Sequence, residues 1–402
     1  MVLKSEIEKT FVEQNARHLP ENMVERDSKI LFSPVSTHIE IITGVRRCGK
    51  STLLFQLMKQ CEEKYAFFSF EDSRIFGFDV EDFSKLDEII GQDTQVYFFD
   101  EIQNVNSWEI YVRQLHDRRK KVYLTGSNAS LLSKELGTRI TGRCLRYELY
   151  PFNYREFLNF TKNSNSEIAM NEYLINGGFP EFLQNRQPGV LQNLLKDILY
   201  RDIAIRYNIK NTRTLFELAL YLLTNTGKLF TYNSLSKIFH IGSANTTSDY
   251  LNWMEDACLF YYLPKFSWSP RQSLVNPRKV YTVDNGLAYA NTLSFTEDRG
   301  RLLENIVYLH LHNQYQSIYY FNETNECDFV VFDNKKCKML IQVCSELNAD
   351  NKNREINGLT EGLNFFNMHE GYIVTLLQND KLKIQNKVIN VISLDKFLIE
   401  NL

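Results

Sequence analysis

The chain has 402 residues, of which 17 are glycine and 8 are proline, and its 46 basic and 49 acidic residues leave a net charge of −3. Glycine and proline together are about half as frequent as in average proteins, which excludes collagen-like and low-complexity chains and favours long regular elements. A net charge this close to zero gives no global signal for a nucleic-acid or membrane-surface protein, although local basic patches are compatible with it.

Neither a membrane span nor a secretion signal is indicated. No stretch approaches the roughly 18 consecutive apolar residues of a membrane span, and residues 1–18 are charged and lack the apolar core of a signal peptide. The seven cysteines form no CxxC pair, so reduced thiols are expected. We therefore expect a cytoplasmic protein that does not bind a membrane.

Residues 39–54 are the most informative segment. An apolar run at 39–43 predicts a buried strand, which is followed by GVRRCGKST and an apolar helix. The spacing G-x-x-x-x-G-K-S between a strand and a helix is the P-loop, whose glycines let backbone amides face phosphate groups. ATP and Mg²⁺ are therefore the expected ligands, and we expect these residues to contact the nucleotide: Gly44, Val45, Arg46, Arg47, Cys48, Gly49, Lys50, Ser51 and Thr52.

The roles within this loop follow from its chemistry. Lys50 should reach the β- and γ-phosphates, and the hydroxyl of Ser51 should bind Mg²⁺. Whether the side chains of Arg46 and Arg47 face the nucleotide or the solvent stays open.

A second motif supplies the carboxylates that hydrolysis needs. Val96-Tyr97-Phe98-Phe99 predicts a buried parallel strand that ends in Asp100 and Glu101, the Walker B pattern. Asp100 would hold Mg²⁺, and Glu101 would act as the general base on the attacking water. The second carboxylate indicates hydrolysis of the γ-phosphate rather than storage of the nucleotide.

Further apolar runs at 65–70, 122–125 and 145–149 complete five strands separated by helix-sized intervals. This rhythm predicts an α/β fold with a parallel sheet covered on both faces. The run at 122–125 is followed by Gly126-Ser127-Asn128, so Asn128, with Ser127 as second choice, is the candidate to sense the γ-phosphate; a plain turn is the alternative.

Two arginines are further candidates for the expected site. Arg139 and Arg143 are flanked by glycines and could offer a guanidinium to the γ-phosphate, either within the chain or across a subunit boundary of a homo-oligomer. A loop with solvated arginines is the alternative, and the sequence does not choose between the two residues.

The chain resembles prokaryotic AAA-type P-loop ATPases whose C-terminal part is similar to the restriction-endonuclease fold. The residues that carry this resemblance are GVRRCGKST, FFDEIQ, LTGSNASLL, LGTRITGR, YPFNYREFL, GGFPE and LLENIVYLHL, at 44–52, 98–103, 124–132, 136–143, 150–158, 177–181 and 302–311. Most such proteins are known only as ATP-binding, so the resemblance implies ATPase chemistry better than it implies a cellular role.

The rest of the chain suggests accessory modules. We expect an N-terminal helical segment at 1–37, the ATPase core at 38–153, helices at 154–226, a winged-helix-like domain at 227–295 and a nuclease-like domain at 296–402. A basic strip on the helices is either a nucleic-acid contact or a solvated face, and it comprises Lys196, Arg201, Arg206, Lys210 and Arg213. The second helix of the helix-turn-helix pattern carries no Arg or Lys, which weakens DNA reading and leaves packing or protein contact as the alternative.

The last hundred residues follow the order α-β-β-β-α-β of PD-(D/E)xK nucleases. Glu304 and Asp328 fit the metal-binding positions of that fold, but the acidic-x-Lys position reads Gln342-Val343-Cys344, so we expect a noncatalytic module. His310 and His312 show no zinc-ligand spacing.

Three functions remain open. The leading hypothesis is an ATPase that couples hydrolysis to a conformational change and associates with DNA. The alternatives are a signalling or defence switch that binds a protein partner, and a nuclease regulated by ATP.

Overall fold

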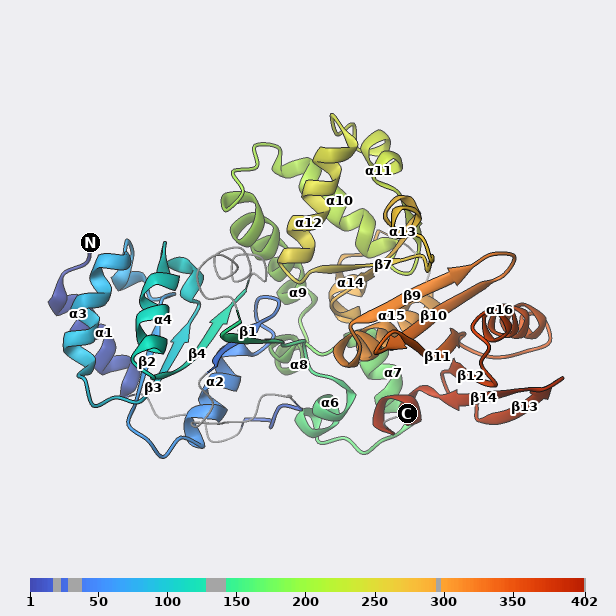
Figure 1. Cartoon of the computed structure of the whole chain (residues 1–402), viewed down its shortest axis with the longest axis horizontal. Helices are drawn as coiled ribbons and strands as arrows, with labels where there is room; N and C mark the ends of the chain where they lie inside the picture. Colours follow the sequence, from blue (N-terminus) through green and yellow to red (C-terminus); the bar gives the residue numbers. More distant parts are fainter. Residues whose placement is uncertain (17–22, 28–37, 128–141, 294–297, 401–402) are drawn as a thin grey trace. The chain divides into compact units, whose positions relative to one another are not determined.

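A computed structural model describes residues 1–16, 23–27, 38–127, 142–293 and 298–400. The chain forms two compact units (Figure 1). Unit 1 comprises Met1–Pro151 with Asp256–Cys258, and unit 2 comprises Phe152–Glu255 with Leu259–Leu402.

Unit 1 is built on a five-stranded parallel sheet in the order β2-β3-β4-β1-β5. Its strands are β1 (Ile39–Thr43), β2 (Tyr65–Ser69), β3 (Val96–Asp100), β4 (Lys121–Gly126) and β5 (Cys144–Glu148). They lie where the apolar runs predicted them, and the predicted α/β fold is confirmed. Every residue of β1, β3 and β4 is buried, as expected for strands covered on both faces.

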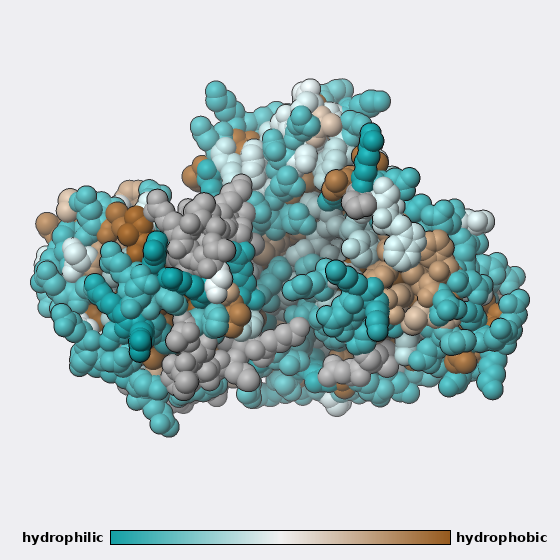
Figure 2. Space-filling view, in the orientation of Figure 1, coloured by the Kyte–Doolittle hydropathy of each residue, from teal (hydrophilic) through white to brown (hydrophobic). Residues whose placement is uncertain are grey.

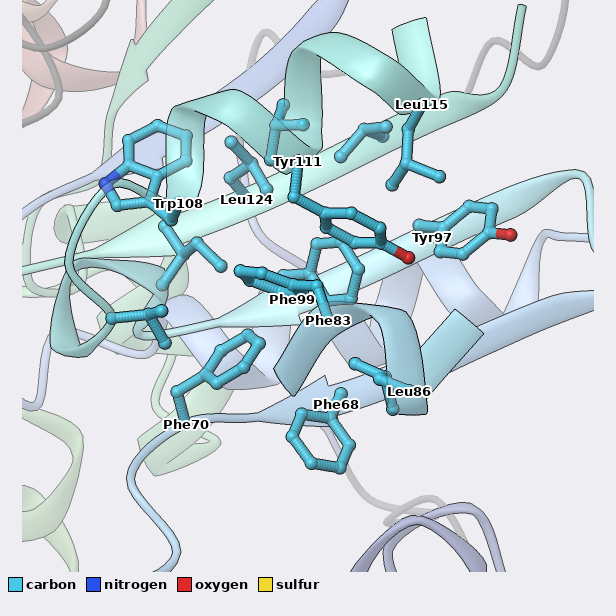
Figure 3. Packing of buried hydrophobic residues seen from close by; sticks show 14 of the residues in the cluster. Phe68, Phe70, Phe83, Leu86, Tyr97, Phe99, Trp108, Tyr111, Leu115 and Leu124 are labelled. Carbon is cyan, nitrogen blue, oxygen red and sulfur yellow. The ribbon is translucent and has the colours of Figure 1, made fainter. Parts of the chain in front are cut away.

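The helices of unit 1 connect these strands. They are α1 (Lys4–Asn15), α2 (Lys50–Lys59), α3 (Phe83–Ile90) and α4 (Trp108–Asp117), with the short 3₁₀ turns η1 (Ser73–Ile75), η2 (Val80–Asp82) and η3 (Ile102–Asn104). Residues of α1, α3 and α4 pack with residues of the strands in one apolar core. In this core Phe83 of α3 stacks on Tyr111 of α4 with ring centroids 4.1 Å apart (Figure 3).

The edge strand β2 is covered by polar side chains of α1. The amide of Asn15 donates to the carbonyl of Phe67 at 2.9 Å and accepts from the Phe67 N–H at 3.0 Å. Gln14 pairs with the backbone of Ser69 in the same way, at 3.2 and 2.9 Å. These bonds satisfy backbone groups that an edge strand would otherwise leave open to another chain.

Unit 2 begins with helices. They are α6 (Tyr154–Thr161), α7 (Glu167–Asn176), α8 (Pro180–Asn185), α9 (Pro188–Asp197), the π-helical segment η4 (Ile198–Ile205) and α10 (Thr212–Thr224). The predicted apolar face of α9 and α10 is buried. Asn153 and Glu156 form a capping box that starts α6, so the chain enters unit 2 through a well-defined helix end.

A three-stranded sheet follows in the order β6-β8-β7, with β6 (Leu229–Phe230), β7 (Phe260–Pro264) and β8 (Arg278–Thr282). The two helices of the predicted helix-turn-helix pattern are α11 (Tyr232–Ile238) and α12 (Ala244–Asp256). The short helices α13 (Pro270–Val275) and α14 (Asn285–Asn291) flank β8 in the sequence.

The C-terminal part of unit 2 is a six-stranded mixed sheet in the order β13-β14-β12-β11-β10-β9. The helix α15 (Arg299–Gln314) precedes β9 (Ser317–Asn322), β10 (Glu326–Asp333) and β11 (Lys336–Val343), and α16 (Lys352–Phe365) precedes β12 (Glu370–Thr375). This is the predicted element order. The structure adds β13 (Asp380–Ile384), β14 (Lys387–Ser393) and α17 (Leu394–Ile399).

A buried carboxylate in unit 2, that of Asp284, accepts hydrogen bonds from the backbone of two segments. Asp284 accepts the backbone N–H of Gly178 at 2.6 Å and that of Leu287 at 2.9 Å. A Cβ on Gly177, whose φ is +65°, would lie 2.2 Å from the carboxylate of Asp284. In the GGFPE segment, the backbone therefore lies in close contact with this carboxylate.

The seven cysteines are all free thiols. Within the described ranges, no helix combines the length and apolar character needed to cross a membrane. Figure 2 shows an apolar area on one face over β9 and β10. The ring of Phe266 stacks on Phe332 of β10 and lies edge-on to Phe366.

Candidate active site

The P-loop occupies the carboxyl edge of the parallel sheet, between the end of β1 at Thr43 and the start of α2 at Lys50. Gly44 has φ of +150° and Gly49 has φ of +104°, conformations that favour glycine. A Cβ on Gly44 would lie 2.2 Å from the carbonyl oxygen of Leu149. The two glycines thus allow the loop to turn tightly and to place the first N–H groups of α2 at the edge where parallel strands bind ligands.

Lys50 is buried at the centre of this loop. Its Nζ donates to the carbonyl oxygens of Gly44 at 3.1 Å and Val45 at 3.2 Å, and it lies 3.4 Å from Oε1 of Glu101. The P-loop lysine and the second Walker B carboxylate, which the sequence predicted separately, therefore meet in one site.

The carboxylate of Asp100 accepts hydrogen bonds from hydroxyl groups of three other elements. Ser51 donates to both of its carboxylate oxygens at 3.0 Å, and Thr125 donates to Oδ1 at 2.6 Å. Ser69 donates to Oδ2 at 3.3 Å. Burial, with the nearby charge of Glu101, raises the pKa of Asp100 to about 6. A cation bound here would relieve this cost because it favours the ionised carboxylate.

Glu101 is held in an unusual backbone conformation, with φ of +52°. Its N–H donates to Oγ1 of Thr125 at 2.9 Å, and its Oε2 accepts a hydrogen bond from Gln103. Burial alone would raise the pKa of Glu101, but the charge of Lys50 and the hydrogen bond from Gln103 lower it. The carboxylate is therefore ionised at neutral pH, as a proton acceptor must be.

The remaining P-loop residues differ in whether their side chains or only their backbone can face a nucleotide. The side chains of Val45 and Cys48 are buried in the protein, so only their backbone can face a nucleotide. Arg46 forms an ion pair with Glu71 at 3.0 Å, and Arg47 is exposed with φ of +63°. Thr52 is half-buried in the first turn of α2.

Ser127 is buried at the end of β4, and its hydroxyl accepts a 3.3 Å hydrogen bond from Nε2 of Gln103. It therefore connects to Glu101 through Gln103. The first-choice sensor Asn128 and the arginine Arg139 lie outside the described residues.

Arg143 is placed away from the P-loop of its own chain. It precedes β5, and its carbonyl accepts the N–H of Ile39 at the start of β1, whereas the P-loop follows the end of β1. Five strand residues, about 15 Å, separate the two edges of the sheet. The side chain of Arg143 forms an ion pair with Asp117 at 3.0 Å. The expected contact within one chain therefore does not fit Arg143, because parallel strands carry their starts and ends to opposite edges.

The sequence reasoning missed two residues that hold the site. Thr125 bridges Asp100 and the backbone of Glu101, and its only signal was a polar residue at the end of a buried strand. Arg26 donates from Nη1 to the carbonyl of Cys48 at 2.8 Å and from Nη2 to the carbonyl of Tyr150 at 2.6 Å. No local pattern marked Arg26, because its partners lie 22 and 124 residues away.

The donor set fits a magnesium nucleotide. Mg²⁺ prefers hard oxygen ligands and is usually held by one or two protein groups together with phosphate oxygens. Asp100 and Ser51 provide such oxygens next to the P-loop lysine. Across the residues that the structure describes, no group of three or more His, Cys, Asp or Glu is placed to hold a metal ion without such a partner.

The structure also brings together the residues of the nuclease-like pattern. Asp328 accepts the N–H of Val343 through Oδ2 at 2.9 Å, and Gln342 accepts the N–H of Asp328 at 3.2 Å. Glu304 and Asp328 both contact Nζ of Lys279, at 3.0 and 2.9 Å. Cys344 is buried, and burial raises the pKa of its thiol to about 12, so it offers neither a cation nor a thiolate.

Known proteins match the chain along most of its length. Residues 36–158 match a family model described as an AAA domain, and residues 168–298 and 299–397 match two domains of unknown function, DUF8612 and DUF4143. Among solved structures, the Walker-type ATPase PABY2304 of Pyrococcus abyssi shares 13% identity at a TM-score of 0.38, over 72% of this chain and 95% of that one. The RuvB Holliday junction branch migration motor of Thermotoga maritima shares 14% at a TM-score of 0.32, over 60% and 84%.

Two relatives by sequence are both uncharacterized. A protein of Haemophilus influenzae is 33% identical over 296 residues, 68% of this chain and 74% of its own length. MJ1544 of Methanocaldococcus jannaschii is 33% identical over 387 residues, 89% of this chain and 86% of its own. With this identity, the chain belongs to the family of MJ1544, and its residues 36–158 are an AAA domain of the P-loop ATPase type.

Proposed function

We propose that this protein is an Mg²⁺-dependent ATPase that couples hydrolysis of ATP to a conformational change and associates with nucleic acid. The observation that carries the ATPase proposal is the meeting of Lys50, Ser51, Asp100 and Glu101 at one edge of the sheet. These four groups supply a phosphate-binding cation, two oxygen ligands for Mg²⁺ and a proton acceptor.

In this proposal each side chain has one task. Lys50 exchanges its contacts with Gly44, Val45 and Glu101 for oxygens of the β- and γ-phosphates. Asp100 and Ser51 hold Mg²⁺, which neutralises charge that develops on the transferred phosphoryl group. Glu101, released from Lys50, accepts a proton from the attacking water. Gln103 holds its carboxylate, and the hydroxyl of Thr125 holds its backbone N–H.

The test is release of inorganic phosphate from ATP by the purified chain, with and without Mg²⁺. We expect turnover that needs Mg²⁺ and disappears in Lys50→Ala. An exposed lysine, Lys64, which pairs with Asp93 on the surface, supplies the control Lys64→Ala with unchanged turnover. Phosphate release that continues in Lys50→Ala would contradict the proposal.

Association with nucleic acid is supported by exposed basic side chains of unit 2. They lie outside α12, whose sequence contains no Lys or Arg, and they are Lys196, Arg201, Lys210, Lys228, Lys237 and Arg271. Such residues favour contact with phosphate groups rather than reading of bases, so binding should be independent of sequence and weakened by salt.

A protein partner is the second candidate, in which the chain acts as a signalling or defence switch. The side chains of Trp268, Leu274 and Val275 are 68 to 74% exposed, and they favour this candidate because a protein partner could cover such apolar groups. Fluorescence anisotropy of a labelled DNA duplex, titrated at low and high salt, separates the two. If the chain does not bind DNA at low salt and DNA does not stimulate its ATPase, the protein-binding switch is the function that remains.

We further propose that the chain works as a homo-oligomer in which an arginine of a neighbouring copy completes the site. Arg139 and Arg143 remain the candidates, and Arg143 fits only the contact between copies. The ATPase rate per chain should therefore rise with protein concentration, and mixing an inactive Lys50→Ala chain with an Arg139→Ala or Arg143→Ala chain should restore turnover only for the arginine that acts between copies.

A further inference from the structure

The side chain of Gln103 lies against Glu101, the candidate general base, because of the backbone between them. Glu101 has φ of +52°, and the N–H of Asn104 donates to the carbonyl of Glu101 at 3.1 Å, which closes the 3₁₀ turn η3. This turn brings the amide of Gln103 back to the carboxylate two residues earlier, so that Nε2 donates to Oε2 of Glu101. The base and its amide partner are therefore encoded in one short segment.

The nitrogen end of this amide is engaged by the protein. An amide NH₂ group carries two N–H donors, whereas the amide oxygen only accepts. Nε2 of Gln103 donates to Oε2 of Glu101 and, at 3.3 Å, to the hydroxyl oxygen of Ser127 at the end of β4. The opposite orientation would place the amide oxygen against a carboxylate oxygen, and two acceptors repel each other. These contacts fix which end of the amide faces Glu101.

The oxygen end of the same amide has no donor. Across the residues that the structure describes, Oε1 of Gln103 is buried and accepts no hydrogen bond from the protein. A buried acceptor without a partner costs free energy, which a donor supplied during the reaction would recover. The oxygen belongs to the group that holds the base, so such a donor would lie next to Glu101.

We propose that Gln103 positions the attacking water through this oxygen, an inference that rests on the proposed ATPase function and adds a residue to it. One O–H of the water donates to Glu101, which takes its proton, and the other donates to Oε1 of Gln103. A lone pair of the water oxygen is then left for the γ-phosphorus. As the new oxygen–phosphorus bond forms, the bond from the γ-phosphorus to the bridging oxygen breaks, and its electron pair leaves with ADP.

The charge state of Glu101 supports this role. Burial opposes ionisation of the carboxylate, whereas the charge of Lys50 and the hydrogen bond from Gln103 lower its pKa. In the proposed reaction Lys50 turns to the phosphates, while Gln103 stays with the carboxylate. One end of the amide thus keeps the base ionised, and the other end holds the water that the base deprotonates.

The test compares kcat for phosphate release with the affinity for ADP in full-length chains. Gln103→Met keeps the length of the side chain and removes both ends of the amide. It should lower kcat by about 10- to 100-fold, as expected for a misplaced reactant, and leave the Kd for ADP unchanged, which also shows that the variant is folded. Gln92→Met, at an exposed position before β3, is the matched control and should equal the parent in both measurements.

The pH dependence separates positioning from a purely structural role. Without the amide N–H the pKa of Glu101 should rise, so the deficit of Gln103→Met should grow as pH falls from about 9 to about 5. In Gln103→Glu the two neighbouring carboxylates share a proton as pH falls. The protonated group again offers one donor and one acceptor, so the deficit of this variant should shrink over the same range.

The outcomes distinguish this inference from the ATPase proposal. If the parent releases phosphate, Lys50→Ala does not, and Gln103→Met turns over at the parent rate, the inference is overturned and the ATPase proposal stands. Deficits of the two Gln103 variants that stay constant with pH would also overturn it, because they would indicate lost packing alone. If Gln103→Met fails to bind ADP, the pH dependence of Gln103→Glu decides. A parent that releases no phosphate would overturn both proposals.

Discussion

The hydroxyl of Ser51, in the first turn of α2, lies 3.0 Å from both carboxylate oxygens of Asp100, the last residue of β3. In the proposed function, this hydroxyl and carboxylate beside a buried lysine are the two protein ligands of a magnesium nucleotide. The relationship joins the two motifs of the sequence into a single site.

Replacement of Asp100 by Asn should lower ATP turnover by about 100-fold or more, because Asn keeps the shape but not the charge that attracts Mg²⁺. The loss should shrink as Mg²⁺ is raised, since a weakened site fills at higher concentration. The measurement is the initial rate of phosphate release against Mg²⁺ concentration. The exposed Asp93→Asn supplies the control and should match the parent at every concentration.

Replacement of Glu101 by Gln should leave ATP binding intact and lower turnover by about 100- to 10,000-fold, the range expected for loss of a general base. Gln can still accept the hydrogen bond from Gln103, but it cannot take a proton from water. Equilibrium binding of a fluorescent ATP analogue and single-turnover hydrolysis separate the two effects. Glu88→Gln, on the exposed pair with Lys4, is the matched control. Full turnover in Glu101→Gln would remove this residue from the role of base.

Thr125 should act as a positioning residue. Thr125→Val removes the hydrogen bond to Asp100 and the acceptor for the N–H of Glu101, with little change in volume. Loss of a hydrogen bond to a buried charge is worth about 1.5–3 kcal/mol, so kcat should fall about 10- to 100-fold while KM for ATP changes little. Thr125→Ser should restore most of kcat. An equal loss in the serine variant would indicate that the methyl group, and not the hydroxyl, matters.

Arg26 should support the P-loop through its fork of two donors. Arg26→Lys offers a single cation in place of two separate N–H groups, so it should not replace the contacts with Cys48 and Tyr150. We expect both Arg26→Lys and Arg26→Ala to weaken nucleotide binding by about tenfold, as expected for loss of one or two hydrogen bonds. Calorimetric titration with ADP measures this. Normal affinity in Arg26→Ala would show that the loop holds its shape without the guanidinium group.

Asp284 should make the stability of unit 2 depend on pH in an unusual direction. Burial raises the pKa of Asp284 to about 6, above about 3.9 in an unfolded chain. Between these two values the folded protein binds the proton more strongly than the unfolded one, so this group adds stability as pH falls from about 7 to about 4, up to about 3 kcal/mol.

Urea unfolding of the parent and of Asp284→Asn, each across this pH range, isolates the effect because other titrating groups are common to both chains. The free energy of unfolding of the parent should rise relative to the variant as pH falls. A difference between the two chains that stays constant with pH would contradict the raised pKa.

Local patterns were enough to predict much of this protein. The strands β1 to β5, the P-loop glycines, and the roles of Lys50, Ser51, Asp100 and Glu101 were expected because each is encoded in a short contiguous motif with its own spacing. The C-terminal element order was predicted for the same reason. Apolar periodicity and carboxylates that end a strand can be recognised from residues close together in the sequence. In a parallel sheet, the ends of the strands meet at one edge, so motifs at these ends come together.

Contacts between distant segments could be known only from the folded chain. Arg26 reaches Cys48 and Tyr150, and Lys279 reaches carboxylates 25 and 49 residues away. Arg143 lies at the edge of the sheet where the parallel strands start, whereas the P-loop lies at the edge where they end. No local pattern encodes such pairs, since the topology brings them together. The sequence thus predicted the chemistry of the proposed ATPase site, whereas only the fold showed which distant residues support that site.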